Sequence, residues 1–303
     1  MNKTIIKRVV FILLSAVLAL IAVAPMQTAG ADHSDWMAAL DDGATLNSIT
    51  IPGTHDSGAL YSIADISGKC QSLAIGEQLE IGVRFFDIRL QLVDDELKIV
   101  HSFVDQLTNF DDVLADIVEF IRVNKSEFLI VSIKEDASPK RSNKNFSEVL
   151  EAMLLSHEEV SGARELPKTV GAARGKIHLV SRYKGASIGL PCYDGWEDDA
   201  AFALDDIYVQ DNFRVTDARE KIADIRSTYS IAMQREYALV LNYTSCYLET
   251  CFPPIYAGLP AHEINRDTQS ALSGEVGEGA LGVLVCDFIT AELADVIIGR
   301  NFK

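Results

Sequence analysis

The stretch Ile49-Thr-Ile-Pro-Gly-Thr-His55-Asp56-Ser57-Gly58 joins two features that together decide the fold. The apolar residues between Leu46 and Ile51 are typical of a short buried strand, and Pro52-Gly53 ends that strand in a turn. The turn delivers an imidazole and a carboxylate, side by side, into a loop. Imidazole titrates near neutral pH and can take or give a proton in a reaction.

Strand-like runs and amphipathic helical segments alternate along most of the chain. The strand-like runs are 47–51, 84–92, 97–101, 128–133, 177–181, 207–209, 238–242 and 281–286. The helical segments are 110–123, 146–155, 219–233, 263–272 and 289–299. Apolar strands separated by helices indicate parallel strands covered by helices. About eight such strands in this length favour an α/β fold with a single distorted TIM-type (β/α)8 barrel.

One connection departs from that pattern. Val93-Asp94-Asp95-Glu96 is typical of a tight turn between two strands, so the second and third strands form a hairpin without a crossover helix. We therefore expect the barrel to be distorted at this place.

Ionisable residues stand where most of these strands end. Active sites of β/α barrels lie at the carboxyl ends of the strands, and strand interiors keep charged groups only when these pair or face a cleft. The residues expected at this rim are His55, Asp87, Arg89, His101, Lys134, Arg182, Asp211 and Asp287. Their convergence predicts a site. Simpler roles exist for some: Arg89 and Asp87 as a structural ion pair, Asp287 as the cap of the following helix, Lys134 as a solvated lysine.

The first 31 residues predict a secretory signal peptide, which leaves residues 32–303 as the catalytic domain. Lys3, Lys7 and Arg8 precede the apolar run 9–23, and Ala29-Gly30-Ala31 offers a cleavage site. The alternative is an uncleaved membrane anchor, because the apolar run approaches spanning length. With cleavage we expect a secreted protein.

The chain is strongly acidic. Its formal net charge is −17 and would become −20 without the three basic residues of the leader. Phosphate backbones and anionic lipid surfaces attract basic patches, so nucleic acid is excluded as a partner and simple electrostatic docking on anionic lipid is disfavoured. The acid-rich run 197–206 is typical of a solvated loop.

Five cysteines lie beyond the leader, an odd number. Cys246 and Cys251 flank a short loop that a disulfide could close, whereas Cys286 lies in an apolar strand and is expected to be buried. No Cys-x-x-Cys spacing or Cys/His cluster occurs, so the sequence predicts no zinc site.

Two histidines on neighbouring strands suggest a base and an acid that work in turn. Arg89 supplies a planar, permanently charged fork suited to phosphate oxygens. Together these residues suggest phosphoryl transfer without a metal. The alternative is that Asp56 and Asp87 hold a hard cation such as Ca²⁺, against which the fixed charges of Arg89 and Lys134 weigh.

An ordered set of segments resembles the catalytic X domain of phosphatidylinositol-specific phospholipase C, most closely the secreted bacterial, metal-independent type. The segments are 49–57, 83–89, His101 with the helix after it, 128–134, 175–183, 209–211 and 285–289.

The resemblance implies a role for each rim residue. His55, oriented by Asp287, would be the general base that deprotonates the inositol 2-hydroxyl. Arg89, with Asp87 beside it, would neutralise the phosphate. His101 with Asp56 would protonate the departing diacylglycerol oxygen. The implied contacts to inositol come from Lys134, Arg182, Asp211 and the ring of Phe213.

The predicted activity is therefore that of a secreted phosphatidylinositol diacylglycerol-lyase, a monomer without cofactor, which yields diacylglycerol and inositol 1,2-cyclic phosphate. Its substrate is phosphatidylinositol at a membrane surface, with glycosylated phosphatidylinositol anchors as the other candidate. Bacterial relatives enter bilayers through exposed tryptophans, whereas this chain has only Trp36 and Trp196, so the loop 247–259 is the expected membrane contact. Two other functions stay open: a metal-dependent glycerophosphodiester-type phosphodiesterase on the same barrel, and a catalytically silent inositol- or glycan-binding barrel.

Overall fold

The computed structural model describes residues 33–62, 68–102, 104–249 and 258–303. The predicted signal peptide, most of the expected membrane-contact loop and Cys251 lie outside these residues. Within the described ranges, no helix has both the length and the apolar character needed to cross a membrane.

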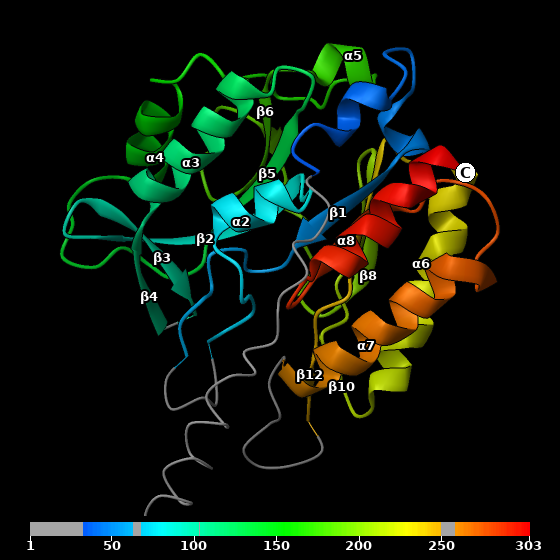
Figure 1. Cartoon of the computed structure of the whole chain (residues 1–303). Helices are drawn as coiled ribbons and strands as arrows, with labels where there is room; N and C mark the ends of the chain where they lie inside the picture. The colour runs from blue at the N-terminus through cyan, green and yellow to red at the C-terminus, as the bar shows by residue number, and fades with distance from the viewer. Residues whose placement is uncertain (1–32, 63–67, 103, 250–257) are drawn as a thin grey trace, which may run out of the picture. The chain divides into compact units, whose positions relative to one another are not determined.

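Parallel strands form the centre of the fold (Figure 1). The central parallel strands are β1 (Thr50–Thr54), β2 (Phe85–Val93), β5 (Leu129–Glu135), β6 (Ile177–Arg182), β9 (Ile207–Gln210), β11 (Leu239–Tyr243) and β13 (Gly282–Cys286). Their order in the sheet is β6-β5-β2-β1-β13-β11-β9, extended by short β7 (Leu190–Pro191) beside β6 and antiparallel β8 (Ala201–Leu204) beside β9. The predicted TIM-type α/β fold is confirmed. In the described part of the chain, however, the hydrogen-bonded order ends at β7 and β8 and does not close into a ring.

The predicted hairpin is also present. β3 (Glu96–His101) pairs antiparallel with β2, and Asp94 and Asp95 both take positive φ, as the two central residues of a type I′ turn must. β4 (Val104–Asn109) then pairs with β3. Because β2 pairs directly with β5, the run 97–101 is a strand but lies outside the barrel order. This excursion is the distortion expected between the second and third strands.

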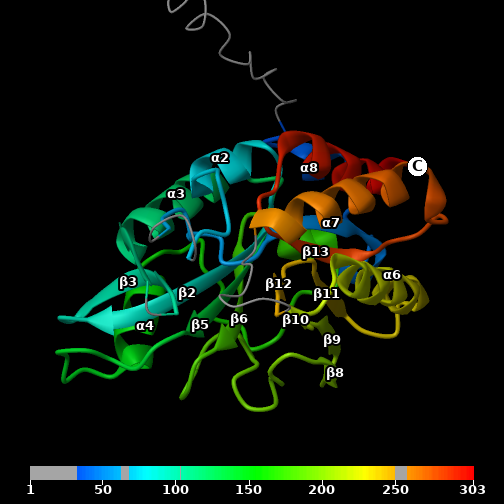
Figure 2. The same ribbon diagram turned by 90° about the horizontal axis from the view of Figure 1, so that it is seen from below.

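Helices cover the outer face of the curled sheet, and Figure 2 shows α2, α3, α7 and α8 together on one side of the strands. The helices are α2 (Ile75–Glu80), α3 (Phe110–Val123), α4 (Phe146–Leu154), α5 (Val170–Ala173), α6 (Ala218–Gln234), α7 (Gly258–Ser270) and α8 (Ala291–Ile298). In α3 the buried residues Phe110, Leu114, Ile117 and Ile121 recur at helical spacing, with acidic residues in the first turn and Arg122 in the last.

The strands alternate between two apolar layers. Ile51, Phe85, Ile130, Val209 and Val283 belong to the cluster inside the barrel. Phe86, Val131 and Leu284, which alternate with them along β2, β5 and β13, belong to the cluster under the helices. Gly53 is needed in this interior, because a Cβ there would lie 2.9 Å from Val283 and 3.0 Å from Phe85. Side chains two and four residues further along each strand share the same face. The interior therefore changes from apolar to ionisable toward the carboxyl ends of the strands.

Candidate active site

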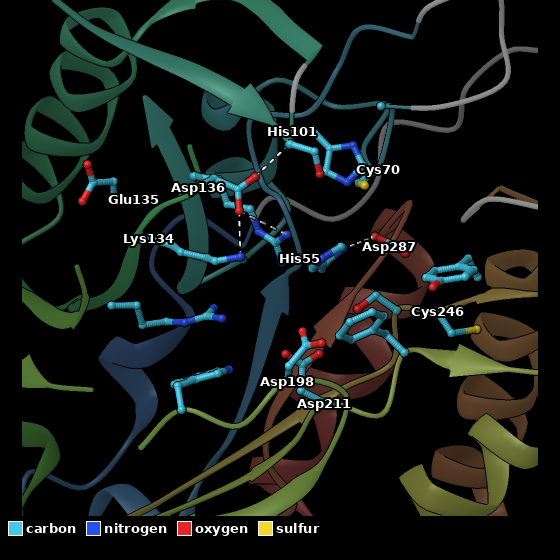
Figure 3. Close-up of a pocket in the computed structure, with 18 of the residues that line it drawn as sticks. His55, Cys70, His101, Lys134, Glu135, Asp136, Asp198, Asp211, Cys246 and Asp287 are labelled. Carbon is cyan, nitrogen blue, oxygen red and sulfur yellow. Dashed lines mark hydrogen bonds and ion pairs between the residues drawn. The ribbon is translucent and has the colours of Figure 1, made fainter. Parts of the chain in front are cut away.

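A cavity of about 540 Å³ opens at the carboxyl ends of the strands (Figure 3). The predicted residues that line it are His55, Arg89, His101, Lys134, Arg182, Asp211, Phe213 and Asp287. Asp56 and Asp87 lie just behind this lining and are 1% and 0% exposed. The structure thus brings every residue singled out in the sequence to one place.

His55 and Asp287 form a short hydrogen bond. His55 follows β1 and Asp287 follows the neighbouring parallel strand β13, and 2.8 Å separates His55 Nδ1 from Asp287 Oδ1. Arg89 Nη2, which can only donate, lies 2.8 Å from His55 Nε2. His55 must therefore accept at Nε2 and donate from Nδ1 to Asp287, which is the tautomer of a neutral general base.

The carboxylate of Asp287 also sets the proton affinity of His55. Burial by itself would lower the pKa of this imidazole, but the charge of Asp287 and the hydrogen bond to it outweigh burial and raise the pKa above its ordinary value. Gln71 Nε2 donates to the His55 carbonyl at 2.8 Å, and Asn265 Nδ2 donates to the Asp287 carbonyl at 2.8 Å. Both members of the pair are thus fixed through their backbones.

The alternative that Asp287 caps the next helix is wrong. α8 begins at Ala291, and the side chain of Thr290 accepts the hydrogen bond from Leu293 N at this helix start. Asp287 instead belongs to the cavity wall.

Arg89 lies between the two histidines. Its Nε and Nη2 donate to Asp87 Oδ2 at 3.3 and 3.2 Å, and its Nε lies 3.3 Å from Asp56 Oδ2. Burial would raise the pKa of Asp87, but Arg89 and Arg182 together hold that pKa below its usual value. The two aspartates that could have held a hard cation are therefore already paired with a guanidinium.

His101 and Asp56 form a looser pair. His101 Nε2 lies 3.4 Å from Asp56 Oδ2, and neither carboxylate oxygen of Asp56 has a hydrogen-bond partner. Burial raises the pKa of Asp56, although Arg89 and His101 oppose the rise. Asp56 is thus placed to orient the His101 ring beside Arg89.

A residue with a left-handed backbone conformation follows each of three reactive residues. Asp56 after His55, Ser102 after His101 and Phe288 after Asp287 have φ of 44°, 54° and 46°. This backbone region is uncommon for residues other than glycine, and most costly for a bulky residue such as phenylalanine. The chain thus turns sharply just beyond each strand end, and the reactive side chain is left facing the cavity.

Three cationic side chains lie in register on the three neighbouring strands β2, β5 and β6. Arg89 is in register with Lys134, and Lys134 is in register with Arg182. Lys134 Nζ lies 2.7 Å from Asp136 Oδ1, so Lys134 is not simply solvated. Such a row of positive charge suits an anionic group bound in the cavity.

Asp136 was not identified from the sequence. Its Oδ2 accepts a hydrogen bond from Ser102 N at 2.7 Å, next to His101, and Arg89 Nη1 lies 4.0 Å from its Oδ1. It therefore links Lys134, Arg89 and the turn after His101. Its position two residues beyond Lys134, just after β5, was the available signal.

The far wall is built around Arg182. The Arg182 guanidinium lies 3.7 Å from the centre of the Trp196 ring, and its Nη1 lies 3.2 Å from Asp87 Oδ1 and 3.3 Å from the Tyr243 hydroxyl. Burial raises the pKa of nearby Asp211, against the charges of Arg182 and Lys221. Trp196 and Tyr243 were also missed, because an aromatic residue in an acidic loop and one in an apolar strand carry no distinctive pattern.

The structure changes one expectation about an exposed segment, that for the run 197–206, and places both tryptophans. Trp36 is buried in the core and Trp196 lies against Arg182, so both tryptophans have structural contacts inside the described part of the chain. The run 197–206 is not simply a solvated loop, because Glu197 and Asp198 line the cavity and β8 lies within the run. Cys286 is buried, as expected.

The fold and the cavity define an α/β-barrel protein with acid–base groups at the carboxyl ends of its strands. Comparison with known proteins narrows this class. Residues 50–183 match the family described as phosphatidylinositol-specific phospholipase C, X domain. The match covers a little under half of the chain, and over that part the chain is similar to this family.

Named relatives agree with the match. The chain is 25% identical over 278 residues to a 1-phosphatidylinositol phosphodiesterase of Listeria monocytogenes. The aligned region covers 88% of this chain and 84% of that protein. It is 30% identical over 164 residues to the protein of the same name from Staphylococcus aureus strain Newman, about half of each chain at 51% and 52%.

Solved structures share the fold. A phosphatidylinositol-specific phospholipase C mutant from Staphylococcus aureus superposes with a TM-score of 0.77 at 22% identity and covers 88% of this chain and 98% of its own. The corresponding Listeria monocytogenes structure gives a TM-score of 0.72 at 23% identity, over 89% and 98% of the two chains.

Proposed function

We propose that this protein is a phosphatidylinositol phosphodiesterase that cleaves its substrate by intramolecular attack, without a metal. The observation that carries the proposal is the continuous series His55, Arg89, Asp56, His101. Arg89 lies 2.8 Å from His55 Nε2 and 3.3 Å from Asp56 Oδ2, and that same oxygen lies 3.4 Å from His101 Nε2. A phosphate bound at Arg89 has a base on one side and an acid on the other.

In the first step, His55 Nε2 takes the proton of the inositol 2-hydroxyl, and the resulting oxygen attacks phosphorus. The bond from phosphorus to the glycerol oxygen breaks, and that oxygen takes the proton of His101. The products are diacylglycerol and inositol 1,2-cyclic phosphate. Arg89 offsets the negative charge that grows on the phosphate oxygens as the new bond forms.

Hydrolysis of the cyclic phosphate would use the same groups with their roles reversed. His101, now neutral, would take a proton from water as the water oxygen attacks phosphorus. The bond from phosphorus to the 2-oxygen would break, and the protonated His55 would give its proton to that oxygen. We expect this second step to be slow, because the cyclic product leaves an open cavity.

The inositol ring would lie against the far wall. Arg182, Asp211 and Lys134 offer donors and acceptors for its hydroxyls, and the ring of Phe213 offers a stacking face. The same proposal includes a monomer that acts at a membrane surface, after export and removal of residues 1–31. Glycosylated phosphatidylinositol anchors are a second substrate to be compared with the free lipid.

Phosphorus NMR of phosphatidylinositol vesicles incubated with the protein in EDTA tests the proposal. We expect the cyclic phosphate signal to come first and the acyclic signal to follow slowly. Activity abolished by EDTA and restored by Ca²⁺ would instead indicate a metal-dependent phosphodiesterase. Binding without turnover would indicate the silent barrel.

A further inference from the structure

Cys70 is held between the two histidine–carboxylate pairs by its backbone. Its N–H donates to the Ala59 carbonyl at 2.9 Å, beyond the turn that carries His55 and Asp56. Its carbonyl accepts from Phe288 N at 2.8 Å, directly after Asp287. The thiol lines the cavity and is 2% exposed, and Figure 3 shows it beside His101. The proposed reaction leaves this side chain without a role.

Cys70 forms a compact cluster with Asp56 and His101. One potential ligand atom from each residue, a sulfur, an oxygen and a nitrogen, lies within 4.8 Å of the other two. Both carboxylate oxygens of Asp56 and Nδ1 of His101 are buried and have no hydrogen-bond partner. Asp56 Oδ2 has ion-pair contacts with Arg89 Nε at 3.3 Å and His101 Nε2 at 3.4 Å, and a bound ion would take the place of these contacts. Unsatisfied buried polar atoms are rare in native structures and mark places where a ligand or ion can bind.

Thiolate, imidazole and carboxylate are the ligands that zinc prefers, and three protein ligands with one open position are common for Zn²⁺. Metal–ligand distances of about 2.0 to 2.3 Å place tetrahedral ligands about 3.5 Å apart, so small side-chain movements would close the cluster around an ion. The fourth position would face the cavity and hold water.

The second cluster near Cys70 is less suited to a metal. It consists of His55, Cys70 and Asp287. Both ring nitrogens of His55 already have partners, Asp287 at 2.8 Å and Arg89 at 2.8 Å. A metal there would have to displace the partner of whichever ring nitrogen it bound.

We infer that Asp56, Cys70 and His101 form an inhibitory site for Zn²⁺ and similar thiophilic divalent cations. Binding transfers the thiol proton to solvent and creates a thiolate, so the ion meets two negative ligands beside the positive charge of Arg89. Six carboxylate side chains line the cavity, against four lysine and arginine side chains. The bound ion occupies Asp56 and His101, the pair assigned to the leaving group, and thereby stops turnover.

The identity of the ligands makes the inhibition selective. Ca²⁺ and Mg²⁺ prefer oxygen ligands and gain little from a thiol. They should therefore leave activity unchanged at concentrations where Zn²⁺ inhibits, and EDTA should reverse the zinc effect.

Cobalt tests the site without any turnover. Co²⁺ replaces Zn²⁺ in such sites, and a bound thiolate gives a charge-transfer absorption in the near ultraviolet. We expect this band in the wild-type protein and its loss in Cys70→Ser. Cys192→Ser is the matched control, since Cys192 also lines the cavity but belongs to neither cluster. Thermal melts establish that the variants are folded, and His101→Ala should weaken cobalt binding.

The inhibition test uses Zn²⁺ with phosphatidylinositol vesicles. Cys70→Ser should keep its activity in EDTA and require at least about ten times more zinc for half-inhibition, whereas Cys192→Ser should match the wild type. A cobalt band that survives in folded Cys70→Ser, or equal zinc sensitivity of the two serine variants, would overturn the inference. Absence of turnover in EDTA would refute the proposed function and leave the cobalt result interpretable.

Discussion

The two histidine–carboxylate pairs differ in how the fold holds them. His55 and Asp287 follow adjacent parallel strands, meet at 2.8 Å, and have their backbone carbonyls fixed by Gln71 and Asn265. His101 ends the hairpin strand outside the barrel order and meets Asp56 at 3.4 Å, with Nδ1 unpartnered.

This difference indicates that the barrel register preorganises one pair, whereas the other depends on an inserted hairpin. Catalytic hydrogen bonds are often long before the substrate binds and tighten in the complex. His101 and Asp56, which protonate the leaving diacylglycerol oxygen, can therefore be 3.4 Å apart before the substrate binds. The same looseness leaves the ligand atoms that zinc would use.

Replacing each catalytic histidine should give the largest loss of activity and should distinguish the base from the acid. On phosphatidylinositol, His55→Ala and His101→Ala should each lose about a thousand-fold or more in kcat/KM, since general acid–base groups contribute on this scale. On an inositol phosphodiester with a nitrophenol leaving group, which needs no protonation to depart, His101→Ala should recover most of its rate and His55→Ala should not.

His178→Ala is the control for this comparison, because His178 is a buried histidine that contacts the Ala173 carbonyl at 3.0 Å and lies outside the cavity lining. Equal losses of His55→Ala and His101→Ala on both substrates would contradict the division into base and acid.

Neutralising each carboxylate should move the pH profile differently. His55 must be unprotonated to act as a base, so kcat/KM should fall as the pH drops through its pKa, which lies above the ordinary 6.5. Asp287→Asn removes the main influence that raises this pKa. The acidic limb should therefore move to lower pH, and the plateau rate should fall about a hundred-fold.

Asp56→Asn should lower the rate but move that limb less, because Asp56 affects His55 more weakly than Asp287 does. Profiles of kcat/KM against pH for both variants provide the measurement. An unchanged limb in Asp287→Asn would mean that Asp287 does not set the proton affinity of His55.

Tyr243→Phe should give the smallest effect. The Tyr243 hydroxyl contacts Arg182 at 3.3 Å, while its ring packs edge-on against His55 with 6.1 Å between centroids, a contact that phenylalanine keeps. Loss of one buried hydrogen bond should raise KM several-fold, since such a bond contributes about 1 kcal/mol, and should leave both the kcat and the pH profile in place. A shift of the acidic limb of the pH profile in Tyr243→Phe would instead mean that the Tyr243 hydroxyl affects the pKa of His55.

Much of the fold follows from local pattern. Helix 110–123 was predicted with the bounds that the structure has, since its apolar residues recur at helical spacing between acidic and basic ends. The first strand was displaced: the sequence places it at 47–51, whereas residues 46–48 form a 3-10 turn and β1 spans Thr50–Thr54. The partner strand β13 fixes that register, and a single sequence does not contain this information.

Some contacts of the active site could likewise be predicted from the sequence, and others could not. Period-two alternation places Asp87 and Arg89 on one face with Phe85, and the sequence alone contains that relation. The contacts of Asp136, Trp196 and Tyr243 with the cations of the cavity depend on which strands are neighbours. Such pairings could not be read from spacing.

The sequence by itself determined that ionisable residues such as Asp87, Arg89 and Asp287 end the barrel strands on their inner face, because strand periodicity and the rule for barrel sites depend only on order along the chain. Only the tertiary structure decided that Arg89 separates the two histidines and that Cys70 lies between their carboxylates. Those contacts join segments far apart in the chain, and their distances depend on strand register and on the sharp turns after His55, His101 and Asp287.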